Sequence, residues 1–248
     1  MIIRNHKNIY PFFRKKNVVL FFIIFFGAIL RISLLCSDQT ISRDAAKYLI
    51  YAACDMKEGV SPSFPPLFLW MIRLIHFFGF SWNMSGWILS LISGIMLIPV
   101  VWMIAIRLTK NETVGIIAAL LTAIHPTLSF LSIEILRDSF FLLIEWIGFY
   151  YLLGIILFDR TYEWMMFGLF SALAFLTRFE GIELLLLLLL APFFMYPRAF
   201  FSHLVGRFLV VAITWLIIFL LASIPNGVDF IKDIYFKRAL FSLHVIQS

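Results

Sequence analysis

The chain has 248 residues, of which 62% are hydrophobic and only 14% are charged, and its mean hydropathy is +0.99. Soluble domains carry roughly 25% charged residues, so this composition excludes water as the main solvent and indicates an integral membrane protein. The net charge of +6 is spread over the ends of apolar segments, which favours contacts with membrane lipids and does not point to nucleic acid as a partner.

The first predicted element is an apolar run over residues 18–36, which follows a basic stretch, residues 1–17. The run is longer than the apolar core of a cleavable signal, so we predict an uncleaved signal anchor. The basic stretch then stays in the cytoplasm, because positive charge is retained on that side. Cys36 and Cys54 are too few for a disulfide framework.

Apolar stretches long enough to cross about 30 Å of hydrocarbon recur along the rest of the chain. Backbone polar groups must be satisfied inside lipid, so each stretch is expected to be a helix and the fold an all-α, polytopic transmembrane bundle. About seven spans are predicted, at residues 18–36, 84–106, 113–133, 139–158, 162–177, 182–197 and 208–224, followed by an extracytoplasmic amphiphilic tail at 225–248.

The apolar segment 65–80 is ambiguous, because it could be a short span or a helix lying in the membrane interface. Arg73 and His76 are three residues apart and would share one polar stripe. If the segment does not cross, five later cations lie in cytoplasmic loops, as the positive-inside rule requires. We therefore expect one extracytoplasmic loop over residues 37–83, with interfacial helices at about 44–58 and 65–79. The five cations are Arg107, Lys110, Arg160, Arg198 and Arg207.

This topology brings charged residues from three loops to the outer face. Glu134 and Arg137 are three apart and Asp138 and Glu145 are seven apart, so each pair is expected on a common helical face. Glu145, about 10 Å below Asp138, is either a functional group or paired with a neighbouring helix. The three groups are Asp44 in the first loop, Glu134, Arg137 and Asp138 in the second, and Arg178, Glu180 and Glu183 in the third.

Two further polar positions have alternative interpretations. His125-Pro126, near the end of the third predicted span, is expected to form a bend rather than a proton relay. Arg178 either snorkels to the interface beside Glu180 or holds the phosphate of a lipid-linked substrate by charge-assisted hydrogen bonds.

The order of these features is similar to that of a known family. After the signal anchor come Arg43-Asp44-Ala45-Ala46-Lys47-Tyr48 and Pro65-Pro66-Leu67-Phe68, then the loop from Glu134 to Asp138, then Leu176-Thr177-Arg178-Phe179-Glu180-Gly181. This order resembles the N-terminal membrane module of the GT-C glycosyltransferases, specifically the dolichyl-phosphate-mannose-protein mannosyltransferase and aminoarabinose-transferase-like group. The resemblance covers about residues 10–224, so residues 18–224 are interpreted as the GT-C-like module.

The resemblance implies that a sugar passes, with inversion, from a polyprenyl-phosphate donor to a protein, lipid or glycan acceptor on the extracytoplasmic side. The membrane would be the cell inner membrane or that of the endoplasmic reticulum. Asp44 matches the acidic residue of the family's first outer loop, which implies the catalytic base, and Ala45 replaces the family's second acid. The other implied substrate-binding residues are Arg43, Tyr48, Glu134, Arg137, Asp138, Arg178 and Glu180. No cofactor is expected, and a divalent metal is left open.

Two other functions are left open by the sequence. One is a non-catalytic or partner-dependent membrane subunit of the same type. The other is a lipid or solute transporter in which Glu145, His125 and Arg178 line a passage. Such transporters usually contain paired repeats or helices broken at the midplane, and the sequence shows neither pattern.

Overall fold

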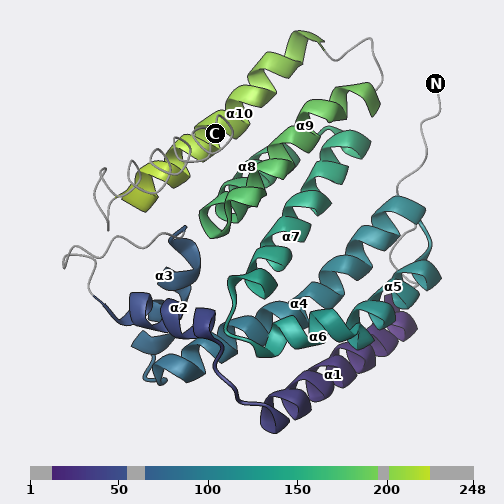
Figure 1. Ribbon diagram of the computed structural model, residues 1–248. Coiled ribbons are helices and arrows are strands. Elements are labelled where there is room, and N and C mark those ends of the chain that lie inside the picture. Colours follow the sequence, from purple (N-terminus) through teal and green to yellow (C-terminus); the bar gives the residue numbers. More distant parts are fainter. Residues whose placement is uncertain (1–12, 55–64, 195–200, 224–248) are drawn as a thin grey trace, which may run out of the picture.

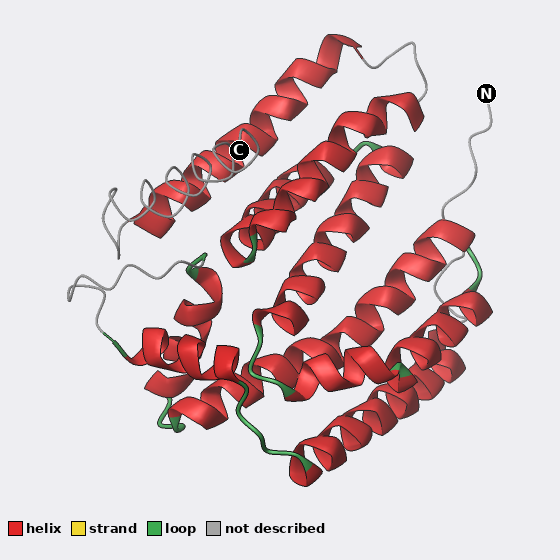
Figure 2. Cartoon of the chain, viewed as in Figure 1, coloured by secondary structure: helices red, strands yellow, loops and turns green. Residues whose placement is uncertain are grey.

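Helices are the only regular elements in the residues that the structure, a computed structural model, describes: 13–54, 65–194 and 201–223 (Figure 2). The all-α prediction is therefore confirmed for this part of the chain. The predicted tail at 225–248 and most of the basic N-terminus lie outside the described residues. The elements are α1 (Phe13–Ser37), α2 (Arg43–Ala53), α3 (Leu67–Phe77), α4 (Trp82–Thr109), α5 (Glu112–Ile124), α6 (Pro126–Ile133), α7 (Arg137–Phe158), α8 (Thr161–Thr177), the 3-10 turn η2 (Phe179–Ile182), α9 (Glu183–Phe194) and α10 (Phe201–Ser223).

The long helices run alternately in opposite directions between the two ends of the molecule (Figure 1). One end, which we call the α2–α3 end, holds these two short helices together with the end of α1 and the start of α7. The opposite end contains the turn from α4 to α5 and the turn from α7 to α8. Loops predicted on the same side of the membrane thus lie at the same end of the bundle.

Three helices are long and apolar enough to cross a membrane: the Asn17–Ser37 part of α1, α4 and α7. The pair α5 and α6 raises this number to four if it forms one broken span. The 11 residues of α3 extend only about 16 Å, which is shorter than the hydrocarbon layer of about 30 Å. The total of seven spans and the interfacial location of α2 and α3 stay predictions.

The third predicted span, residues 113–133, is broken into two helices, α5 and α6. The sequence analysis had predicted a bend near the end of this span. It is bent by 55° where α5 gives way to α6, at His125-Pro126. Proline cannot donate the backbone hydrogen bond that would continue α5, and it fits the first position of α6. The His125 ring accepts from the Leu128 N–H at 3.4 Å, so the prediction of a bend is confirmed.

Arg31 of α1 satisfies the carbonyls that this bend leaves without helical partners. Its guanidinium is fully buried and donates to the carbonyls of Thr122 at 3.2 Å and Ala123 at 2.9 Å, and to Ser132 Oγ of α6 at 3.2 Å. The carbonyl end of a helix carries partial negative charge, which favours a cation there. Arg31 therefore ties α1 to both halves of the bent segment.

The short helix α2 is held against α3 by an apolar interface. Its side chains Ala45, Tyr48, Leu49 and Ala52 are buried in one cluster with Phe68, Leu69 and Ile72 of α3. Ser42 begins α2 by accepting the Ala45 N–H at 3.3 Å, a normal N-terminal cap. This packing fixes the face of α2 that remains open, which includes Asp44.

Arg73 of α3 clamps the other end of α2. It donates to the backbone carbonyls of Ala52 and Cys54, both at 2.7 Å, and of Tyr51 at 3.0 Å. His76 accepts or donates at the Phe80 carbonyl at 2.6 Å and stacks on Trp82 at the start of α4. The polar stripe of α3 therefore connects α2 on one side and the turn to α4 on the other.

Candidate functional site

Arg178 occupies a tight turn at the α2–α3 end of the bundle. Its extended backbone ends α8, and its N–H still donates to the Ala174 carbonyl at 2.8 Å. The chain then turns back through η2, where a Cβ at Gly181 would clash with the backbone of Ala174 and Phe175. Only glycine fits this approach, which directs the Arg178 side chain toward α7.

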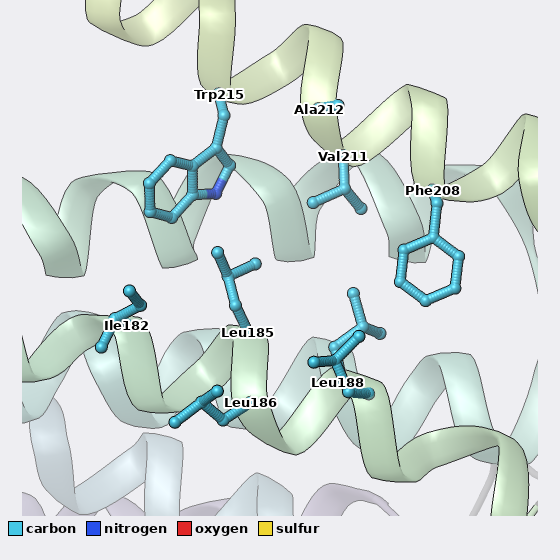
Figure 3. Close-up of a pocket in the computed structure, with 9 residues that line it drawn as sticks. Ile182, Leu185, Leu186, Leu188, Phe208, Val211, Ala212 and Trp215 are labelled. Atoms are coloured by element: carbon cyan, nitrogen blue, oxygen red, sulfur yellow. The ribbon is translucent and has the colours of Figure 1, made fainter.

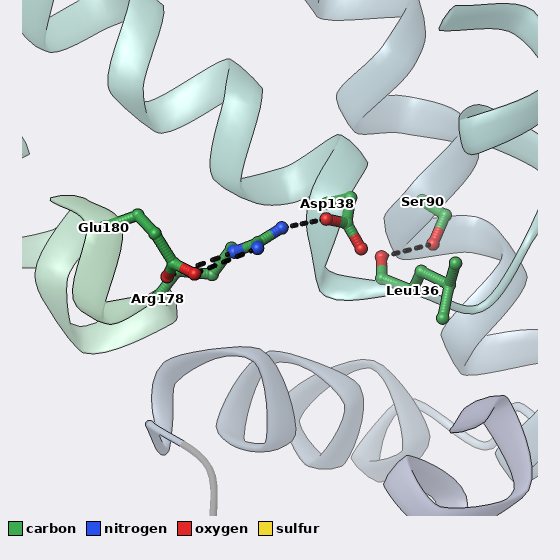
Figure 4. A network of polar contacts seen from close by, with 5 residues as sticks. All are labelled: Ser90, Leu136, Asp138, Arg178 and Glu180. Carbon is green, nitrogen blue, oxygen red and sulfur yellow. Dashed lines mark hydrogen bonds and ion pairs between the residues drawn. The ribbon is translucent and has the colours of Figure 1, made fainter. Parts of the chain in front are cut away.

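The Arg178 guanidinium joins two carboxylates from different elements (Figure 4). It forms an ion pair with Asp138 of α7 and a fork with Glu180, whose oxygens lie 3.1 and 3.3 Å from its nitrogens. Partial burial lowers the pKa of Arg178, but the hydrogen bond to Glu180 and the charge of Asp138 outweigh this effect and raise it. The same hydrogen bond lowers the pKa of Glu180. Both groups are therefore charged.

Hydrogen bonds that join α4 to the start of α7 fix the position of Asp138. Ser139 Oγ donates to the Ser90 carbonyl at 3.0 Å, and Ser90 Oγ donates to the Leu136 carbonyl at 3.5 Å (Figure 4). Ser90 and Ser139 are both buried, so this connection is protected from water. The sequence analysis did not single out either serine.

Glu134 and Arg137 do not share a helical face, contrary to the prediction. Glu134 follows the last residue of α6, and Arg137 is the first residue of α7. Between them the backbone is extended, with the Leu136 N–H bonded to the Glu134 carbonyl at 2.9 Å. Asp138 and Glu145 do lie on one helix, α7, as expected. Burial, with a smaller contribution from neighbouring carboxylates, raises the pKa of Glu134.

Asp44 and Tyr48 of α2 were predicted as site residues. Both lie close enough to the charged residues around Arg178 to interact with them electrostatically. Tyr48 is buried against the edge of Phe68, 5.4 Å between ring centroids, and its hydroxyl lies in the field of Arg137, Asp138 and Arg178. Burial raises the pKa of Tyr48. Its oxygen is therefore a neutral hydroxyl that can donate a hydrogen bond.

Asp44 is exposed and forms an ion pair with Lys47 at 2.8 Å, one turn along α2. The hydrogen bond from Lys47 lowers the pKa of Asp44, and the charges of Lys47, Arg43 and Arg137 act in the same direction. Asp44 is thus an ionised carboxylate open to an approaching molecule. Arg43 is exposed next to it, and Ala45 is buried against α3. An acid at position 45 would point into apolar packing.

The structure therefore gathers most of the predicted site residues at one end, from three segments distant in sequence. Two of the other positions noted in the sequence are elsewhere or have structural roles: His125 caps α6, and Glu145 lies half-buried further along α7. Within the described ranges, no three His, Cys, Asp or Glu side chains are grouped so as to hold a metal ion. The gathered residues are Asp44, Tyr48, Arg137, Asp138, Arg178 and Glu180.

An apolar groove of about 550 Å³ runs between α9 and α10 (Figure 3). Ile182, the last residue of η2, is two residues along the chain from Glu180. It lies at one end of the groove, opposite Trp215. Leu188 and Phe208 lie at the other end. The groove could not be predicted, because the leucines that line it look like any lipid-facing sequence.

A family model described as dolichyl-phosphate-mannose-protein mannosyltransferase matches residues 63–226, which is more than half of the chain. The chain belongs to this family. It is accordingly an integral membrane protein of the GT-C glycosyltransferase type, which confirms the resemblance seen in the sequence. No curated protein and no solved structure matches the chain significantly.

The family match covers the mannosyltransferase-like segment that contains Asp138, Arg178 and Glu180. It begins after α2, so Asp44 and Tyr48 lie outside the matched residues. Their place beside the matched cluster comes from the structure alone, through the packing of α2 on α3.

Proposed function

We propose that the chain transfers a sugar from a polyprenyl-phosphate donor to a hydroxyl group of an extracytoplasmic protein, lipid or glycan at the α2–α3 end. The observation that carries the proposal is the position of Arg178. This cation contacts Asp138 of α7, and an apolar groove begins four residues further on, at Ile182. A cation beside such a groove suits an amphiphile whose phosphate is joined to a long hydrocarbon.

The donor's phosphate binds Arg178 and its hydrocarbon lies between α9 and α10. Glu180 is the carboxylate that gives way to the phosphate, because its side chain is 48% exposed whereas that of Asp138 is 29% exposed. The guanidinium fork then matches two phosphate oxygens and stabilises the charge that the leaving phosphate acquires.

Asp44 acts as the general base, since its carboxylate is ionised and exposed. It takes the proton of the acceptor hydroxyl while the acceptor oxygen bonds to the anomeric carbon. The bond from that carbon to the phosphate oxygen breaks, and the phosphate keeps the electron pair. Attack from the face opposite the phosphate inverts the anomeric configuration. Tyr48, Arg137, Asp138, Glu134 and Arg43 orient the two substrates.

Reconstitution of the full chain in vesicles with radiolabelled polyprenyl-phosphate sugars tests this mechanism. Asp44→Asn keeps the size of the side chain but removes the base, so transfer should fall by at least about 100-fold. Asp38→Asn is the matched control, because Asp38 is an exposed carboxylate in the same loop and should leave transfer unchanged.

Arg178→Lys keeps the charge and removes the fork, so kcat/KM for the donor should fall roughly thirtyfold, equivalent to about 2 kcal/mol.

Normal transfer by Asp44→Asn would remove Asp44 from the role of base. Failure of the wild-type chain with every donor would favour the non-catalytic subunit instead.

A further inference from the structure

The end of the bundle opposite the candidate active site carries a cluster of cations. It lies where α4 and α7 end and α8 begins (Figure 1). Four described cations meet here around the aromatic rings of Tyr150, Phe158 and Trp164. They are Arg107, Lys110, Arg160 and Arg207.

Two of these cations are neutralised by carboxylates. Arg107 is buried and forms an ion pair with the fully buried Glu163, which also accepts the Tyr162 hydroxyl at 2.7 Å. Arg207 forms an ion pair with Asp159, whose carboxylate also accepts the indole N–H of Trp164 at 3.1 Å. Both carboxylates are thus already engaged.

Lys110 and Arg160 differ from Arg107 and Arg207 in this respect. Among the described residues, neither forms an ion pair with a carboxylate. Lys110 Nζ donates to the Arg107 carbonyl at 2.8 Å and lies 5.2 Å from the centre of the Phe158 ring. The Arg160 guanidinium lies 5.4 Å from the same ring centre. Both cations thus lie beside the Phe158 ring, and a ring does not cancel their charge.

Exposed apolar side chains lie near these two cations in the chain. Phe158 is 43% exposed, and Leu108 and Leu157, one residue before the ends of α4 and α7, are 54% and 45% exposed. Both helices are long and apolar enough to cross a membrane. A ligand at this place therefore meets positive charge on one side and hydrocarbon on the other, which selects an amphiphile.

We propose that Lys110 and Arg160 bind the phosphate of an anionic phospholipid in the leaflet that faces this end, with Phe158 against its first acyl carbons. The lysine supplies a point charge and the arginine a planar fork, and phosphate accepts from both. The site is separate from the sugar donor's, at the other end of the bundle, and does not depend on the proposed transfer reaction.

Lipid titration of the purified full chain, followed by native mass spectrometry, tests this site. The probes are phosphatidylglycerol, phosphatidylcholine and inorganic phosphate. The wild-type chain should retain its first phosphatidylglycerol in preference to phosphatidylcholine, and Lys110→Gln/Arg160→Gln should weaken this preference at least about tenfold. Asp159→Asn/Arg207→Gln removes two charges of opposite sign at the same end and should keep the preference.

Melting curves in phosphatidylcholine first establish that both double variants are folded. The proposal is overturned if Lys110→Gln/Arg160→Gln keeps the wild-type preference, or if the Asp159/Arg207 variant loses it equally. Displacement of the lipid by millimolar inorganic phosphate would indicate a site for free phosphate and would also overturn it.

Discussion

Asp44 and Arg178 are each paired with a neighbouring group of opposite charge. Lys47 donates a hydrogen bond to Asp44 at 2.8 Å and lowers its pKa, and Glu180 accepts a hydrogen bond from Arg178 at 3.1 Å. Neither partner is buried, so each contact can be exchanged for a substrate group at little cost. A group of the substrate can therefore take the place of Lys47 at Asp44 and of Glu180 at Arg178.

The pH dependence of transfer should report on the Asp44–Lys47 contact. The hydrogen bond from Lys47 lowers the pKa of Asp44, so the base stays deprotonated and active to a lower pH than an isolated aspartate. In Lys47→Met this pKa rises toward its ordinary value, and the acid limb of kcat/KM moves to higher pH. Lys47→Arg should leave the limb in place. An unmoved limb in Lys47→Met would show that the limb does not report Asp44.

At the scale of elements, α2 is a short helix held in place by α3. Its 11 residues are too few to be stable alone in water, so its position rests on its apolar face and on the clamp at its end. Arg73 provides three hydrogen bonds to carbonyls at the end of α2 and directly after it. Because α2 carries Asp44 and Tyr48, this clamp sets where the proposed base lies relative to Arg178.

Arg73→Met should release the end of α2 while keeping the aliphatic packing of the side chain. The loss of charge-assisted bonds to backbone is expected to cost about 2 kcal/mol of local stability, so amide hydrogen exchange in α2 should quicken roughly thirtyfold. Arg73→Lys should give a smaller change. Exchange in α7 is the internal reference. Equal protection of α2 in the wild type and in Arg73→Met would contradict the clamp.

At the scale of the whole molecule, the sequence predicted the class of fold and the end at which the site residues meet. Hydropathy and the distribution of cations decided both, since they follow from the properties of the bilayer. The bend at His125-Pro126 was also predictable, because proline acts locally. The serines that position Asp138 were not, since their hydrogen bonds join residues 46 and 49 positions apart.

Buried charges were the other features that the sequence left undetermined. Arg31 lies within an apolar run, and only the structure shows that it serves the broken helix of α5 and α6. Similarly, Arg107 was interpreted as an orientation signal, although it is buried in a pair with Glu163. Such partners depend on which helices are neighbours, which periodicity and spacing do not determine.

The central claim is that α2 and the Arg178 turn face the same side of the membrane. In a chain with Cys36 and Cys54 changed to serine, single cysteines at the exposed positions Thr40, Glu180, Thr113 and Thr161 can be labelled with a membrane-impermeant maleimide in sealed vesicles of known orientation. Positions 40 and 180 should be labelled from one side, and 113 and 161 from the other. Labelling of 40 and 180 from opposite sides would contradict the proposed active site.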